Sequence, residues 1–125
     1  MIGPLNIQGT EETPSVNFDA SSSTFEILGR SYPEDAHSFY EPIIKWLMEY
    51  GQNPADQTHL VVDLEYFNSG SVKKVFNILY MIEDIMETGK DVKVIWKHKV
   101  GDELMQQKGL EFQNFLQVPV EVVEY

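Results

Sequence analysis

After residue 58 the sequence alternates between the hydrophobic period of a β-strand and that of an α-helix. This alternation restricts the fold more than any other feature. Strand-like runs lie at residues 59–66, 91–97 and 118–123. Between them lie two helical patterns, one that begins at Val72 and ends at Gly89 and one over residues 102–115. Strands joined through helices pair in parallel, and their crossovers are right-handed. We therefore expect these three strands in one sheet, with helices packed against it.

The beginning of the chain predicts short β segments instead. A weak strand is expected at residues 5–7, and two further strands at 15–18 and 24–28 flank a turn-like Asp-Ala-Ser-Ser-Ser stretch, which indicates a hairpin. The whole order is β-β-β-α-β-α-β-α-β. It predicts an α/β fold of one domain over residues 1–125, with a mixed β-sheet and about three helices.

Three local features refine this prediction. Residues 60–62, Leu-Val-Val, form a dense apolar run that is typical of a strand buried on both faces. Pro119 suits an edge strand, because proline cannot donate to a neighbouring strand. Gly109 interrupts the last helical pattern and makes it less regular than the others.

A first helix is expected between the hairpin and residue 51. Capping-box spacing occurs twice, at Ser31 with Glu34 and at Ser38 with Glu41, and Gly51 is a natural stop. Pro42 is tolerated only near a helix start, so the helix begins near Ser38 or is kinked. The residues predicted to form its apolar face are Ala36, Phe39, Tyr40, Ile43, Leu47 and Tyr50.

Composition excludes several classes of function. The formal net charge of −11 disfavours binding to nucleic acid and to anionic lipid, because both need a basic surface. With no cysteine, the chain has no disulfide, no zinc–thiolate site and no cysteine nucleophile. Neither a signal peptide nor an apolar run of membrane-spanning length is visible. We therefore expect a cytoplasmic protein without a cofactor.

The segment Asn68-Ser69-Gly70-Ser71 joins a strand to a helix and is the first candidate site. Its serines lie at a helix N-terminus, where unpaired N–H groups and a partial positive charge favour a cap or a phosphate. Serine is a common N-cap, so one interpretation is purely structural. The other interpretation is a phosphoacceptor. A serine nucleophile has no support, since no G-x-S-x-G motif and no placed base accompany it.

The residues around this segment are candidates for contact with a phosphate or a partner. Lys73 and Lys74 follow within about one turn of Ser69. Tyr66 and Phe67 precede it, either as part of the core or as contact anchors. The acidic side chains of the same helix, Glu83, Asp84 and Glu87, are expected to form a solvated face.

A metal-dependent enzyme is the rival from another class. Asp63 and Glu65 share one strand face and could hold a metal together with a histidine, although two carboxylates alone make a weak site. His37, His59 and His98 show no metal-binding spacing and are expected at the surface or at caps. Bound metal in the purified protein would favour this enzyme.

The motifs in their order resemble those of a known family. They comprise Gly9-Thr10 with Thr13-Pro14, Ser31-Tyr32-Pro33-Glu34, the run from Tyr66 to Ser71, and Val94-Ile95-Trp96. The architecture resembles the STAS-type fold of anti-sigma-factor antagonists. More closely, and over nearly the full length, the chain resembles the SiaC family of bacterial regulatory phosphoproteins.

The resemblance implies a non-catalytic switch in a signalling pathway. In that family a serine/threonine protein kinase and a metal-dependent protein phosphatase act on one hydroxyl, and the unphosphorylated form binds a downstream protein. The best-understood target is a diguanylate cyclase. The residue that matches the acceptor is Ser69, a serine where the family also carries threonine. Gly70 replaces a hydroxyl residue of some relatives, which leaves Ser71 as the alternative acceptor. Asn68, Gly70, Tyr66, Phe67, Lys73 and Lys74 are then the expected partner contacts. An adaptor without a phosphoswitch remains a third hypothesis.

Overall fold

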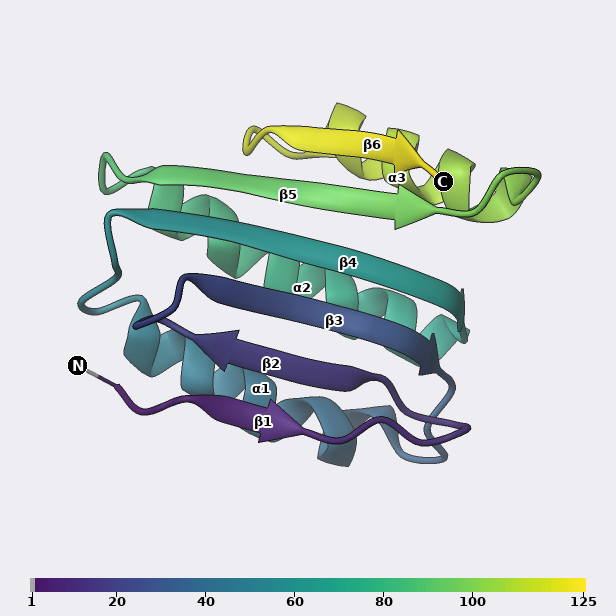
Figure 1. Cartoon of the computed structure of the whole chain (residues 1–125), viewed down its shortest axis with the longest axis horizontal. Helices are drawn as coiled ribbons and strands as arrows, with labels where there is room; N and C mark the ends of the chain where they lie inside the picture. The colour runs from purple at the N-terminus through teal and green to yellow at the C-terminus, as the bar shows by residue number, and fades with distance from the viewer. Residues whose placement is uncertain (1) are drawn as a thin grey trace.

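A single six-stranded sheet with three helices makes up the computed structural model, which describes residues 2–125 (Figure 1). The strands lie in the sheet in the order in which they occur in the sequence, so every neighbour in the sheet is also the next strand of the chain. The elements are β1 (Leu5–Ile7), β2 (Ser15–Asp19), β3 (Thr24–Ser31), α1 (Ala36–Tyr50), β4 (Gln57–Phe67), α2 (Ser69–Met86), β5 (Asp91–His98), α3 (Glu103–Phe115) and β6 (Val120–Glu124).

The sheet is mixed, as the sequence predicted. β1, β2 and β3 pair antiparallel, and the β2–β3 hairpin places Val16 opposite Ile27 and Phe18 opposite Phe25. From β3 to β6 every pair is parallel, because a helix separates each strand from the next. β6 forms one edge of the sheet and Pro119 directly precedes it, as expected for this residue.

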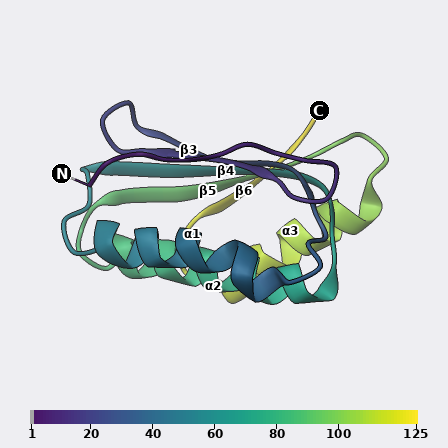
Figure 2. The same cartoon turned by 90° about the horizontal axis from the view of Figure 1, so that it is seen from below.

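All three helices cover the same face of the sheet (Figure 2). Residues of β4 are therefore buried at every second position, and Leu60 and Val62 are fully buried while Val61 between them is only half-buried. The prediction that this strand is buried on both faces is wrong. An apolar run such as residues 60–62 therefore does not require helices on both faces of the sheet. On the face without helices, Val61 has charged neighbours such as Asp63 and Lys97.

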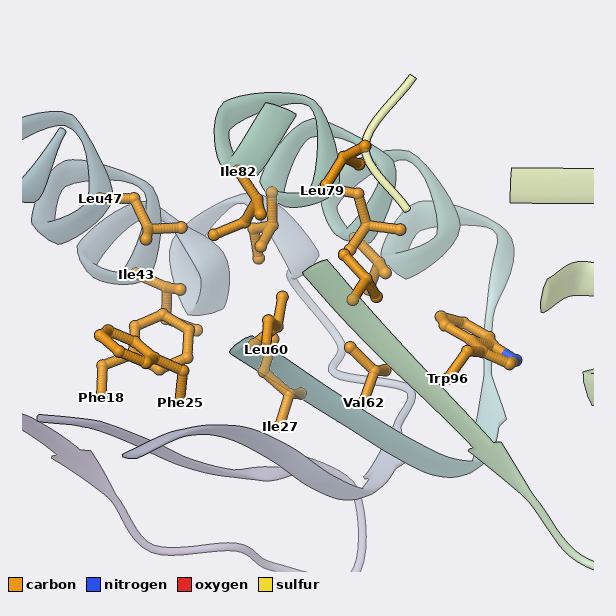
Figure 3. Packing of buried hydrophobic residues seen from close by; sticks show 14 of the residues in the cluster. Phe18, Phe25, Ile27, Ile43, Leu47, Leu60, Val62, Leu79, Ile82 and Trp96 are labelled. Carbon is orange, nitrogen blue, oxygen red and sulfur yellow. The ribbon is translucent and has the colours of Figure 1, made fainter. Parts of the chain in front are cut away.

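The core lies between the sheet and the helical layer (Figure 3). Under α1, the rings of Trp46 and Tyr50 stack at 5.0 Å. Under α3, the indole of Trp96 donates to the carbonyl of Met105 at 2.8 Å and lies against the backbone of Gly109. A Cβ at position 109 would lie 2.5 Å from Trp96 Cδ1, so glycine occurs inside this helix because the indole fills the space.

α1 begins differently from the prediction. Its N-cap is Asp35, whose carboxylate accepts from the backbone N–H of Ser38 at 3.2 Å. Neither capping box forms, because Ser31 is buried at the end of β3 and Ser38 lies inside the helix. Pro42 lies inside the helix, which starts at Ala36 rather than near Ser38. The helix ends at Tyr50 with Gly51 as its C-cap, as predicted.

Glu83 also contradicts a prediction, since it is 7% exposed and does not belong to a solvated face. Its carboxylate accepts the backbone N–H groups of Gln117 and Val118 and so attaches α2 to the loop before β6. Asp84 and Glu87 are exposed, as expected. Within residues 2–125, no helix is both long and apolar enough to cross a membrane.

Candidate functional site

The N-terminus of α2 is fixed by Asn68, which is the helix N-cap. Its side-chain oxygen accepts the backbone N–H of Ser71 at 2.9 Å, and its carbonyl accepts that of Val72 at 3.0 Å. Its own N–H donates to the carbonyl of Ser31 at 2.9 Å. Of the four residues in the segment, the asparagine therefore performs the capping for which the serines were candidates.

Ser69 is the first residue of α2 and is exposed. Within residues 2–125, its hydroxyl has no hydrogen-bond partner. The backbone N–H groups of Ser69 and Gly70 likewise find no acceptor in this part of the chain. Two N–H groups at the positive end of an 18-residue helix thus point outward beside a free hydroxyl.

Ser71 is in the opposite situation, because it is fully buried. Its hydroxyl accepts from Ser31 Oγ at 2.8 Å, and Ser31 Oγ also shares a hydrogen bond of 2.5 Å with the hydroxyl of Tyr40. Burial raises the pKa of Tyr40 above its ordinary value, so the phenol stays protonated and bonded. This hydroxyl cluster joins the last residue of β3 and the first turn of α2 to the second turn of α1.

The two lysines of α2 point in different directions. Lys73 is exposed and lies one turn beyond Ser69, at the spacing that places two side chains on one helix face. Lys74 turns toward α1, where its Nζ lies 3.2 Å from Nδ1 of His37. Gly70 also faces α1, since a Cβ on it would lie 3.4 Å from the Cβ of Ala36, an ordinary contact.

The two aromatic residues before the site differ in exposure. Tyr66 is 46% exposed and packs edge-on against Tyr32, with 5.7 Å between the ring centroids. Phe67 is 8% exposed and packs against Trp96 at 5.9 Å. Tyr66 is thus accessible to a partner, whereas Phe67 supports the site from within the core.

The residues of the metal-enzyme hypothesis are engaged elsewhere. Both carboxylate oxygens of Asp63 accept from the hydroxyl of Tyr125, at 2.8 and 2.7 Å, and this bond raises the pKa of Tyr125 to about 12. Glu65 accepts from Lys99 at 2.8 Å, which lowers the pKa of its carboxyl. In residues 2–125, no group of three histidine or acidic side chains is placed to hold a metal ion.

The histidines do not join these carboxylates. His59 lies beside Asp91 on β5 at 3.2 Å, and His37 lies beside Lys74 and Glu41. His98 is buried, with its Nδ1 3.1 Å from the carbonyl of Lys99, so it is neither a surface nor a cap residue as expected.

Sequence reasoning missed the hydroxyl cluster and the capping role of Asn68. Ser31 and Ser71 are 40 residues apart, and only the parallel pairing of β3 with β4 brings them together. The signal for Asn68 was present, because asparagine is as good an N-cap as serine. Two exposed aromatic residues, Tyr80 and Phe115, were also missed, since their positions do not fit the predicted apolar faces.

Comparison with known proteins supports one family. An uncharacterised protein of Pseudomonas aeruginosa (strain UCBPP-PA14) is 28% identical over 118 residues, covering 92% of this chain and 91% of the relative. The solved structure of SiaC of Pseudomonas aeruginosa matches with a TM-score of 0.90 and 23% identity, over 99% of this chain and 100% of that one. A chain in the crystal structure of the diguanylate cyclase SiaD in complex with its activator SiaC, from the same species, matches with a TM-score of 0.88 and 24% identity, over 97% and 99%.

The two structural likenesses show that the fold is shared. The family itself is shown by a sequence model that matches residues 7–125, nearly the whole chain, and that describes the SiaC family regulatory phosphoproteins. The chain described here therefore belongs to the SiaC family of regulatory phosphoproteins.

Proposed function

We propose that the chain is a non-catalytic signalling switch whose phosphorylation site is Ser69. A serine/threonine kinase would phosphorylate this residue and a metal-dependent phosphatase would reverse the reaction. The observation that carries the proposal is the free, exposed hydroxyl on the first residue of α2, beside two unpaired backbone N–H groups. A kinase can reach this hydroxyl, and a phosphate on it gains donors without any change of fold.

Ser69 is preferred over Ser71 for a physical reason. Ser71 is 0% exposed and bonded to Ser31, so a kinase could reach it only after α2 had partly unfolded. A phosphate there would also need a charge of about −1.5 to −2 inside the core, with only hydroxyl neighbours to compensate it. At Ser69 the same charge lies in water, at the positive end of a helix dipole.

Phosphorylation would act on binding and not on folding. A partner that covers Ser69 excludes water from the phosphate, and a doubly charged group that loses this water without gaining a new partner across the interface costs roughly 2–5 kcal/mol. Such a cost weakens binding by about 30-fold or more. The unphosphorylated form is therefore the form that binds the downstream partner.

The first candidate for that partner is a diguanylate cyclase. SiaC of Pseudomonas aeruginosa is described as the activator of the diguanylate cyclase SiaD, and this chain shares its family and fold. We extend the same role to this chain, so that binding of the unphosphorylated form regulates cyclase activity. Because a kinase and a cyclase use cytoplasmic nucleotides, we place the switch in the cytoplasm.

The experiment has two arms. Phosphosite mapping of the chain isolated from its own cells, over several growth states, should find phosphate on Ser69 in a state-dependent amount. Proteins captured on immobilised chain are then compared between three baits, the wild-type chain, the chain with phosphoserine incorporated at position 69, and Ser69→Ala.

We expect wild type and Ser69→Ala to retain the same partner and the phosphoserine bait to lose it. Because Asn68 caps the helix, Ser69→Ala should change the free energy of unfolding by less than about 0.5 kcal/mol. Equal capture by all three baits would show a constitutive adaptor and overturn the proposal. Phosphate found only on Ser71 would move the acceptor and contradict the role of Ser69.

A further inference from the structure

One face of α2 carries a stripe of three exposed side chains and one half-buried phenylalanine, and this stripe begins at the proposed phosphoacceptor. Ser69, Lys73, Phe76 and Tyr80 follow each other at spacings of four, three and four residues, which place them on one side of a helix. α2 lies between α1 and α3 in the helical layer (Figure 1), and the end of α3 meets the stripe at Phe76, against which Phe112 and Phe115 pack. We call these four residues, together with Phe115 of α3, the α2 stripe.

The second half of the α2 stripe is an aromatic patch open to water. Phe76 lies 5.6 Å from Tyr80 and 6.4 Å from Phe115 between ring centroids, and so connects the two helices. Tyr80 is 51% exposed and Phe115 is 77% exposed, the largest exposed fraction among the large apolar side chains of residues 2–125. Clustered aromatic side chains of this kind are typical anchors of protein–protein contacts.

Lys73 supplies a free positive charge between this patch and Ser69. The chain has 20 acidic residues and 9 basic ones, so an exposed positive charge is scarce on its surface. Among residues 2–125, Lys73, Lys74 and Lys97 form no ion pair with an acidic side chain, and of these only Lys73 lies exposed on α2 beside the aromatic patch, because Lys74 contacts His37 and Lys97 lies on β5. Lys73 is therefore available to an anionic group that arrives from outside.

We propose that the α2 stripe is the docking surface for the downstream partner, and that the partner presents an amphipathic helix to it. The inference rests on the function proposed above. Aliphatic side chains of the partner helix would cover Tyr80 and Phe115, and a carboxylate at its end would pair with Lys73. From Ser69 to Tyr80 the stripe extends about 16 Å along α2, the length of a partner helix of about three turns.

This arrangement also explains how a phosphate on Ser69 acts. Ser69 and Lys73 are separated by one turn, so a phosphate on Ser69 lies within reach of the lysine ammonium. The phosphate would occupy the lysine and repel the partner's carboxylate at the same time. Aromatic contacts further along the stripe would remain, and phosphorylation would therefore weaken binding without changing the docking site.

A second apolar surface provides the control. A shallow cavity between α1 and α2 is lined by Met48, Met81 and Ile85, among others, and Met48 is 62% exposed. This cavity lies toward the other end of α2, and its residues Met81 and Ile85 are more than three turns from Ser69. A phosphate on Ser69 therefore could not directly affect a partner that binds in the cavity.

The test uses the partner captured with unphosphorylated chain, titrated by calorimetry against single variants. Tyr80→Ser and Phe115→Ser should each raise the Kd at least about tenfold, and Met48→Ser should leave it within about twofold. Lys73→Gln should raise the Kd less, but should remove part of its dependence on salt concentration. All four side chains are exposed, so circular dichroism should report an unchanged fold.

The outcomes separate the two proposals. A partner that distinguishes phosphorylated from unphosphorylated chain, yet binds Tyr80→Ser and Phe115→Ser as tightly as wild type, overturns the docking surface and leaves the switch intact. Loss of binding by Met48→Ser alone would assign the contact to the α1–α2 cavity and also overturn it. If the free chain self-associates and the double variant Tyr80→Ser/Phe115→Ser abolishes this, the patch binds a second copy instead. A partner indifferent to phosphate refutes the function proposed above.

Discussion

Replacement of the buried carboxylate of Glu83 should reveal how strongly α2 is attached to the last strand of the sheet. Glu83 accepts two backbone N–H groups, from Gln117 and Val118, in the loop that connects α3 to β6. In Glu83→Leu both donors lose their acceptor. The leucine fills a similar volume, so the change removes hydrogen bonds without leaving a large cavity.

The expected size of the effect follows from the burial of the two donors. Val118 is 1% exposed, and a buried donor without a partner costs about 1–3 kcal/mol. Gln117 is exposed, so water can replace the carboxylate at its N–H and the cost there is smaller. We expect Glu83→Leu to lower the free energy of unfolding by about 2–3 kcal/mol, since both bonds are to a charged group. For a chain of this size the midpoint of thermal unfolding should fall by roughly 8–12 °C.

Urea denaturation followed by circular dichroism measures this change. The control is Asp84→Leu, which places the same side chain at the next, exposed position of α2 and should change stability by less than about 0.5 kcal/mol. Glu83→Gln keeps an acceptor oxygen and should cost only about 1 kcal/mol. Equal stability of Glu83→Leu and Asp84→Leu would refute the reasoning, because it would mean that the buried bonds contribute nothing.

Further predictions concern other parts of the fold. Gly109→Ala places a methyl group against Trp96, so it should lower stability by about 1–3 kcal/mol in urea denaturation despite the higher helix propensity of alanine; a more stable variant would contradict the packing. Asn68→Ala should lower stability by about 0.5–2 kcal/mol and speed amide exchange in the first turn of α2, and unchanged exchange would exclude the cap. Tyr125 keeps its proton up to a pKa of about 12 through Asp63. Its contribution to stability is thus complete below pH 10 and lost between about pH 10 and 12. Tyr125→Phe should therefore lose less stability than wild type over this range in alkaline urea titrations, although the raised pKa of Tyr40 gives both proteins some loss. The same loss in both proteins would refute it.

The order of the elements could be predicted from the sequence because hydrophobic periodicity is a local property. Patterns within a few residues predict the β2–β3 hairpin, the parallel crossovers and the edge position of the strand that follows Pro119. The structure confirms each of these predictions. Element ends were less predictable. α1 starts at Ala36 because Asp35 caps it, although two serine-based capping patterns competed in the sequence.

Side chains of the candidate site were predictable in kind but not in role. A helix N-terminus with hydroxyl residues was visible in the segment Asn68 to Ser71, and the family motifs pointed to Ser69. Nothing in the segment showed which serine is buried. That depends on Ser31 and Tyr40, which are distant in the sequence and contact Ser71 only after β3 and α1 have packed.

The sequence by itself therefore determined the order of strands and helices, the mixed sheet and the family, because these depend on local spacing and on motifs. The tertiary structure alone decided that all helices cover one face, that Glu83 is buried while Asp84 is exposed, and that Ser69 is accessible while Ser71 is not. The physical reason is that burial is set by the element packed opposite a residue. Two neighbours on one helix can therefore have opposite environments, although the sequence around them is the same.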